Sequence, residues 1–239
     1  RWNRVYRAGI KLEGVGNVAR HNLIHHAPHQ AIGFAGNDHV MEFNEIHNVC
    51  EESNDAGAIY AWCDWAARGN VFRFNYVHHC YGHNERSCAG IYLDDNWSAC
   101  HIHGNIFHDV PKAVMLGGGR DHIVENNLFV NCKPPMHIDA RGLNWRKYGK
   151  AELTKSLQQW PYKDEPWRSK YPKLVTILDD DPMAPAGIII RRNIYWQGWR
   201  WDSGFYNNVQ AYLTVADNLT ETDPLFMAPE KGDFRFKDG

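Results

Sequence analysis

Long apolar segments and an excess of either charge are both missing from this sequence. No apolar run approaches the roughly 20 residues that a membrane-spanning helix needs. The 239 residues carry a formal net charge of −2, so the chain has no electrostatic attraction for nucleic acid or an anionic membrane surface. We therefore expect neither nucleic acid nor a membrane as a partner.

Cysteines at metal-binding spacing are missing too. None of the six cysteines stands in a C-x-x-C pair, a common cysteine signature of a zinc site, and we assign no metal or other cofactor. An initiator methionine is also absent, because the chain begins at Arg1 and stops at Gly239. From this we expect a processed or excised piece of a longer protein.

A repeated unit runs through most of the chain. Segments such as NVARHNLIHH, HVMEFNEIHN and NVFRFNYVHH align on one asparagine, with a large, mostly apolar residue two positions later. This asparagine recurs at six places: Asn22, Asn44, Asn75, Asn105, Asn127 and Asn193. The successive spacings are 22, 31, 30, 22 and 66 residues. A unit near 22 residues, with short strands and no helical period, is typical of a solenoid.

The strand residues identify the type of solenoid. A leucine-rich repeat has a similar period and an asparagine ladder, but it requires L-x-x-L-x-L, and the strands here carry Val, Ile, Phe and Tyr. The sequence therefore predicts an all-β fold, a single-stranded right-handed parallel β-helix. Residues 1–239 form one domain, with a partly helical insertion at about 143–187 and a closing segment at about 216–239.

The second strand of each repeat predicts the candidate site. When these strands are stacked, isoleucine, leucine and similar residues fall in inward columns, and one outward column contains Tyr60, Tyr92 and His137. The next outward column reads Ala35, Trp62, Asp94, Gly117, Asp139. We expect Gly117 to leave an open notch between the two aspartates. Asp55 precedes the Tyr60 strand, so it is expected across the aromatic row from Asp94.

Aromatic faces beside paired carboxylates are typical of sites that cleave glycosidic bonds. One protonated carboxyl group donates to the leaving oxygen, while the other acts as nucleophile or activates water. We therefore interpret Asp55, Asp94 and Asp95 as candidate catalytic residues. The expected substrate contacts are Tyr60, Trp62, Tyr92, His137, Asp139 and Arg141. For a single loop aspartate the plainer interpretation is a cap on backbone N–H groups.

Long segments of the chain resemble a known enzyme family. NDHVMEFNEIHNVCEESNDAGAIYAWCDWAARGNVFRFNYVHH, GIYLDDNWSACHIHGNIFHDV, GGGRDHIVENNLFVNCKPPMHIDARG and KYPKLVTILDDDPMAPAGIIIRRNI are similar to the β-helix enzymes of glycoside hydrolase family 141 and relatives. The tail DNLTETDPLFMAPEKGDFRFKDG resembles their closing segment.

The resemblance implies a pectin-lyase-like solenoid that is secreted, periplasmic or on the cell surface of a bacterium. It implies α-L-fucosidase or xylanase activity on plant cell-wall glycans, with catalytic aspartates at Asp55 and at Asp94 or Asp95. Relatives read Asp-Asp-Ala-Gly where this chain has Asn54-Asp55-Ala56-Gly57. They are also longer, so an N-terminal remainder of the same protein or an associated chain is expected to cap the solenoid.

Two other functions remain open at this stage. A polysaccharide lyase would use a Lys or Arg base, with Arg120, Arg141 and Lys133 as candidates. It would also use Ca²⁺ held by Asp55, Asp94 and Asp139. A non-catalytic carbohydrate-binding β-helix is the third interpretation.

Histidines and cysteines also recur in the repeat. His25, His47, His78 and His108 each follow the repeated asparagine by three residues, and we interpret them as a structural stack, because a straight column cannot surround a tetrahedral ion. Cys50, Cys80 and Cys132 fall near one turn and are expected to be buried thiols. A disulfide between Cys80 and Cys88 is the alternative.

Overall fold

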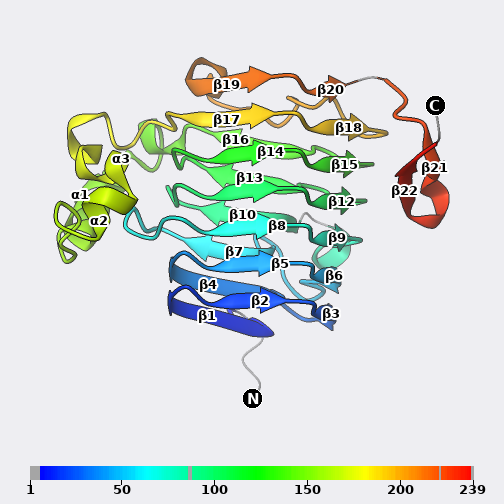
Figure 1. Ribbon diagram of the computed structural model, residues 1–239, viewed down its shortest axis with the longest axis horizontal. Helices are drawn as coiled ribbons and strands as arrows, with labels where there is room; N and C mark the ends of the chain where they lie inside the picture. The colour runs from blue at the N-terminus through cyan, green and yellow to red at the C-terminus, as the bar shows by residue number, and fades with distance from the viewer. Residues whose placement is uncertain (1–5, 86–87, 221, 238–239) are drawn as a thin grey trace.

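Each turn of the chain adds one short strand to each of three parallel sheets, which stack into a solenoid (Figure 1). The computed structural model describes residues 6–85, 88–220 and 222–237. Sheet A has six strands: β1 (Ile10–Val15), β4 (Ile32–Asn37), β7 (Gly57–Trp62), β10 (Ala89–Asp94), β13 (Val114–Gly117) and β16 (Met136–Asp139).

Sheets B and C have seven strands each. Sheet B comprises β2 (Val18–Arg20), β5 (Val40–Glu42), β8 (Val71–Arg73), β11 (His101–His103), β14 (Ile123–Glu125), β17 (Ile188–Arg191) and β19 (Leu213–Ala216). Sheet C comprises β3 (Leu23–Ala27), β6 (Glu45–Val49), β9 (Tyr76–His78), β12 (Ile106–His108), β15 (Leu128–Val130), β18 (Ile194–Trp196) and β20 (Leu219–Thr220). The predicted parallel β-helix is confirmed.

The core consists of columns of equivalent residues from successive coils. One inward column of sheet A is fully buried and contains Ile32, Ile59, Ile91, Val114 and Met136. On sheet C, the rings of Phe107, Phe129 and Tyr195 stack nearly parallel, with centroids 5.2 and 4.9 Å apart. Because β-branched and aromatic side chains fit a pleated surface, these residues favour strands over helices.

The repeated asparagines form a continuous hydrogen-bonded ladder between sheets B and C. The side-chain Nδ2 of Asn105 donates to Oδ1 of Asn127 at 2.9 Å, and Oδ1 of Asn105 accepts from the side chain and backbone N–H of Asn75. Nδ2 also donates to the backbone carbonyl of Phe72. The pattern continues through Asn193 to Asn218, a position that the sequence comparison did not include.

The residue before each ladder asparagine has a left-handed backbone. The φ angle is positive at His21, Phe43, Phe74, Gly104, Asn126, Arg192 and Asp217. This conformation costs about 1 kcal/mol or more for a residue with a side chain. The ladder hydrogen bonds offset this cost, so non-glycine residues are accommodated at the turn.

Five of the six cysteines are thiols packed inside the solenoid. All six are free, and Cys50, Cys80, Cys88, Cys100 and Cys132 are buried. Burial raises the pKa of the Cys80, Cys100 and Cys132 thiols to about 12. The prediction of buried thiols is confirmed, and the alternative Cys80–Cys88 disulfide is absent.

The insertion leaves the solenoid after β16 and returns at β17. Its helical segments are η2 (Arg141–Leu143), η3 (Lys147–Gly149), α1 (Lys150–Leu157), α2 (Trp167–Lys170), α3 (Pro172–Val175) and η4 (Ile177–Asp179). They pack on one side of the solenoid (Figure 1). A separate apolar cluster joins Leu153, Leu157 and Leu174 to Trp65 of the loop after β7. The insertion is thus helical as expected, and its first helical turn begins slightly earlier, at Arg141.

The C-terminal part returns to the solenoid before it ends in a hairpin. Strands β19 and β20 complete a last coil, and β21 (Phe226–Ala228) pairs antiparallel with β22 (Asp233–Phe236). Phe234 of this hairpin contacts the rings of Tyr76 and His108. The remaining short helical turns are η1 (His83–Glu85), η5 (Val209–Tyr212) and η6 (Pro229–Lys231). Across the described residues, no helix is long and apolar enough to cross a membrane.

The ladder predicts a graded effect of asparagine removal. Asn105→Ala leaves the buried backbone N–H of Asn75 and one of its two side-chain N–H groups without an acceptor, so we expect a loss of about 3 kcal/mol in the free energy of unfolding. Asn22→Ala, at the partly buried start of the ladder, should cost about 1 kcal/mol. Urea titrations followed by circular dichroism measure both, and equal losses would contradict the ladder's role.

Candidate functional site

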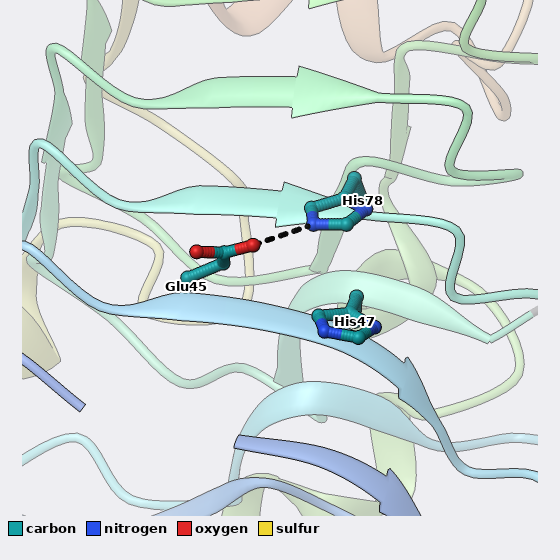
Figure 2. Close-up of side chains that lie close together, drawn as sticks. All are labelled: Glu45, His47 and His78. Atoms are coloured by element: carbon teal, nitrogen blue, oxygen red, sulfur yellow. Dashed lines mark hydrogen bonds and ion pairs between the residues drawn. The ribbon is translucent and has the colours of Figure 1, made fainter. Parts of the chain in front are cut away.

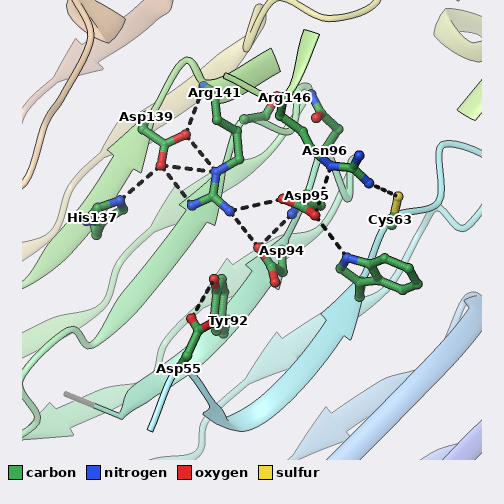
Figure 3. A network of polar contacts seen from close by, with 12 residues as sticks. Asp55, Cys63, Tyr92, Asp94, Asp95, Asn96, His137, Asp139, Arg141 and Arg146 are labelled. Carbon is green, nitrogen blue, oxygen red and sulfur yellow. Dashed lines mark hydrogen bonds and ion pairs between the residues drawn. The ribbon is translucent and has the colours of Figure 1, made fainter. Parts of the chain in front are cut away.

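Sheet A carries the candidate site on its outward face, near the ends of β7, β10 and β16. The strand register pairs Tyr60 with Tyr92, and Trp62 with Asp94. In the next two coils it pairs Gly117 of β13 with Asp139 of β16. The predicted columns are therefore confirmed, and they bring the aromatic residues and the carboxylates together (Figure 3).

The space above Gly117 is filled, which corrects the expectation of an open notch. A Cβ atom on Gly117 would lie 2.7 Å from Cζ of Arg141, because the guanidinium group lies directly over this glycine. Arg141 comes from η2, at the start of the insertion. The glycine thus leaves room for an arginine that bridges two coils.

Arg141 is the central cation of the site. Its Nε and Nη2 donate to Asp139, and its Nη1 donates to Asp94 at 2.6 Å and to Asp95 at 3.2 Å. Asp139 also contacts Nε2 of His137 at 3.0 Å. Burial alone would raise the pKa of Asp139, but the hydrogen bonds from His137 and Arg141 outweigh it and lower this pKa to about 2. Asp139 is therefore ionised and fixed.

Asp95 lies at the turn after β10 and holds a second arginine of the insertion. It accepts hydrogen bonds from Nε1 of Trp62 at 3.1 Å and from Nε of Arg146 at 3.0 Å. Arg146 also donates to the thiol of Cys63. Asp95 thereby connects the floor of the site to the insertion.

Asp94 is a largely buried carboxyl group whose pKa is raised. Its carboxylate accepts a hydrogen bond from the hydroxyl of Tyr60 at 3.1 Å. Burial and the adjacent negative charge of Asp95 raise the pKa of Asp94, although Arg141 and the tyrosine hydroxyls oppose the shift. Of the carboxyl groups in this network, Asp139 has a lowered pKa and Asp94 a raised one. Such divergence separates an acid from a permanently charged group.

Asp55 lies beside a hollow of about 350 Å³ that opens next to Tyr92. The Tyr92 hydroxyl donates to Oδ1 of Asp55 at 3.3 Å, and the neighbouring Tyr60 hydroxyl donates to Asp94. Asp55 itself is exposed to solvent.

Lys112 and Met115 also line this hollow, and sequence reasoning did not select either as a site residue. Lys112 lies two residues before Val114. Gly57 and Ala89 occupy the same position in their strands, two residues before Ile59 and Ile91. Extending the alignment of the strands to this position would have identified Lys112.

The predicted sugar contacts differ widely in exposure. Trp62 is 51 % exposed and offers a free ring, whereas Tyr92 is 3 % exposed and packs edge-on against Tyr60. Tyr92 therefore contributes its hydroxyl group to the site and no stacking face, contrary to expectation. Asp139 and Arg141 are each 5 % exposed and hold one another, so they position the site from below.

His137 lies at the partly buried edge of the same column. Its ring contacts Tyr206, with centroids 4.8 Å apart, and Tyr206 is 45 % exposed. Tyr206 comes from the segment after β18, so the sequence columns could not place it here.

The groups proposed for a lyase are differently arranged. Arg120 is buried in contacts with Asp121 and Asp180 of the insertion. Burial would lower the pKa of Arg141, but its bonds to Asp139 outweigh this and raise that pKa, so Arg141 is not a proton acceptor. Within the described residues, Asp55, Asp94 and Asp139 do not converge closely enough to hold one metal ion. This corrects the expected Ca²⁺ set.

Comparison with known proteins agrees with the fold. Residues 8–133, more than half of the chain, match the family model described as the right-handed beta helix region. The chain belongs to the right-handed β-helix family. Domains of this family are shared by pectin lyases and glycoside hydrolases. No curated protein and no solved structure matches the chain.

The opposite pKa shifts predict opposite pH effects on stability. A carboxyl group with a lowered pKa stabilises the fold above its unfolded pKa, and this contribution is lost as the pH falls through the folded pKa. For Asp139 we expect Asp139→Asn to lower the free energy of unfolding by about 2 kcal/mol at pH 7, with the difference from wild type vanishing between about pH 5 and pH 2.

Asp94→Asn is the matched comparison. Because the pKa of Asp94 is raised, its ionised form disfavours folding at pH 7, and the amide should raise the free energy of unfolding there. Urea unfolding at a series of pH values tests both variants. Equal destabilisation by the two substitutions would show that the carboxylates belong to one structural ion-pair network.

Proposed function

We propose that this protein is a glycoside hydrolase that uses Asp94 as its general acid and Asp55 as its base or nucleophile. The observation that carries the proposal is a pair of neighbouring tyrosines that hold the two carboxyl groups: Tyr60 donates to Asp94, Tyr92 donates to the exposed Asp55, and the two rings pack edge-on. The raised pKa of Asp94 supports it. A general acid must hold its proton near the working pH, and its partner must be ionised and accessible.

The surroundings suit a carbohydrate chain. The exposed ring of Trp62 is a stacking surface for a sugar, and the Asp55 hollow lies on the other side of Tyr92 from Asp94. A polysaccharide or branched oligosaccharide of the plant cell wall fits this open surface, with α-L-fucoside or xylan linkages as the first choices. Such a substrate requires a secreted, periplasmic or cell-surface enzyme of a bacterium.

A polysaccharide lyase is the second candidate, and Lys112 favours it. This lysine lines the same hollow as Asp55, where an amine can abstract a proton from a uronate. Lys112 joins Lys133 as a candidate base, whereas Arg120 and Arg141 are guanidinium groups held against Asp180 and Asp139. A non-catalytic binding module is the third candidate and needs none of these acids.

Activity measurements on two variants test the hydrolase. Asp55→Asn and Asp94→Asn should each lower kcat/KM by about three orders of magnitude or more, because each removes one of two acid–base groups. The assay uses a panel of aryl glycosides, xylan fragments and pectic oligosaccharides. Glu51→Gln, an exposed acid at the turn before Asp55, serves as the control and should retain full activity.

The outcomes separate the three candidates. An unsaturated product that absorbs in the ultraviolet and disappears in Lys112→Met would identify a lyase. Binding of a sugar without turnover, unchanged by Asp55→Asn, would identify a binding module. Either result excludes the paired-aspartate mechanism.

Asp95 supplies a further test through the pH profile. Its charge raises the pKa of Asp94, so Asp95→Asn should lower that pKa. The general acid then loses its proton at lower pH, and the basic limb of the kcat/KM profile should move to lower pH. An unmoved basic limb would exclude Asp94 as the acid that controls it.

A further inference from the structure

A carboxylate and two imidazoles gather on the outer face of sheet C, on a different sheet from the candidate catalytic site (Figure 2). They belong to Glu45 and His47 of β6 and His78 of β9. One potential ligand atom from each residue lies within 4.8 Å of the others. Within the described part of the chain, this is the one group of three His, Cys, Asp or Glu side chains that could hold a metal ion.

The strand geometry explains why these side chains meet. Glu45 and His47 are two residues apart on one strand, so they project from the same face. His47 and His78 are register partners in adjacent coils, and their rings stack with centroids 4.7 Å apart. Glu45 adds a ligand from beside the histidine column, so the geometry is no longer that of a straight stack.

Hydrogen bonds occupy the same ring nitrogen, Nδ1, of both histidines. Nδ1 of His47 bonds to Oδ1 of Asn48 at 2.7 Å, and Nδ1 of His78 contacts Nδ1 of His79 at 2.8 Å. Nε2 of each ring therefore remains for an ion. Metal-binding histidines are commonly held in this way, with the second nitrogen donating to a neighbouring oxygen or nitrogen acceptor.

The local charge favours a cation. Among the described residues, His78 is the only basic side chain at ion-pair distance from Glu45, and its Nε2 is 3.4 Å away, at the long limit of a hydrogen bond. Glu125 on sheet B differs, because Arg191 and Arg192 both neutralise it.

The carboxylate is specific to this coil. In neighbouring coils the register position of Glu45 is occupied by Leu23, Tyr76 and Ile106, so His25 and His108 have no equivalent acid beside them. A single site is therefore expected in place of a row of sites.

We propose that Glu45, His47 and His78 bind one divalent transition-metal ion of the zinc type. Two imidazole nitrogens and one carboxylate oxygen form a set that Zn²⁺, Ni²⁺ and Cu²⁺ accept, with the fourth position left to water. Glu45 is half exposed, which gives the ion access from solvent. The ion joins two coils and thereby stabilises the folded solenoid.

Isothermal titration calorimetry of the whole chain with Zn²⁺, after treatment with chelator, tests the site. We expect one equivalent bound with micromolar affinity, together with a rise in Tm that EDTA reverses. Glu45→Gln and His78→Asn should each weaken binding at least tenfold. His103→Asn, a partly buried histidine on sheet B, should leave both binding and the Tm shift unchanged.

Two results would overturn the proposal. One is that the wild-type chain does not bind one equivalent of Zn²⁺ with micromolar affinity. The other is one equivalent that persists in both Glu45→Gln and His78→Asn, because the ion would then bind elsewhere. Circular dichroism of each variant without metal shows that the fold is intact, so weaker binding is assigned to the lost ligand.

Discussion

The asparagine ladder is the constraint on which the rest of this structure depends. Each ladder amide bonds to the next coil and to a backbone carbonyl of the preceding one, so it fixes the position and the height of every turn. The register is so firm that Asn127 bonds to Asn193 after a 66-residue excursion of the chain. All three sheets inherit their alignment from these turns, and with it the columns that bring distant residues together.

This constraint explains what the sequence could predict. Because equal slots stack, aligning the second strands of the repeats by their own residue pattern was enough to pair Tyr60 with Tyr92 and Trp62 with Asp94. The parallel sheets, the buried thiols and the helical insertion followed from the same period and from composition. No comparable rule assigns a sugar, a linkage or a catalytic role, so these remain proposals.

What escaped prediction lies between the columns. Strand periodicity predicts the face from which a side chain projects, but not which residues a long side chain contacts. The contact of Arg141 with Asp94 across Gly117 could therefore not be predicted. The burial of Tyr92 depends on Met115 and Ala89, which pack around it. The meeting of Glu45 with His78 likewise depends on a diagonal contact across two strands.

The return of the chain to register after the insertion has a consequence for how such proteins diversify. The turn that follows β16 is an insertion point. A long segment is inserted there, and the coils on either side of it still pair in register. Exchange of the segment is nevertheless restricted at both ends, because Arg141 and Arg146 bind Asp94 and Asp95, and Asp180 binds Arg120. A transplanted insertion would have to carry these three residues with it, so the portable unit is the insertion together with its first and last turns.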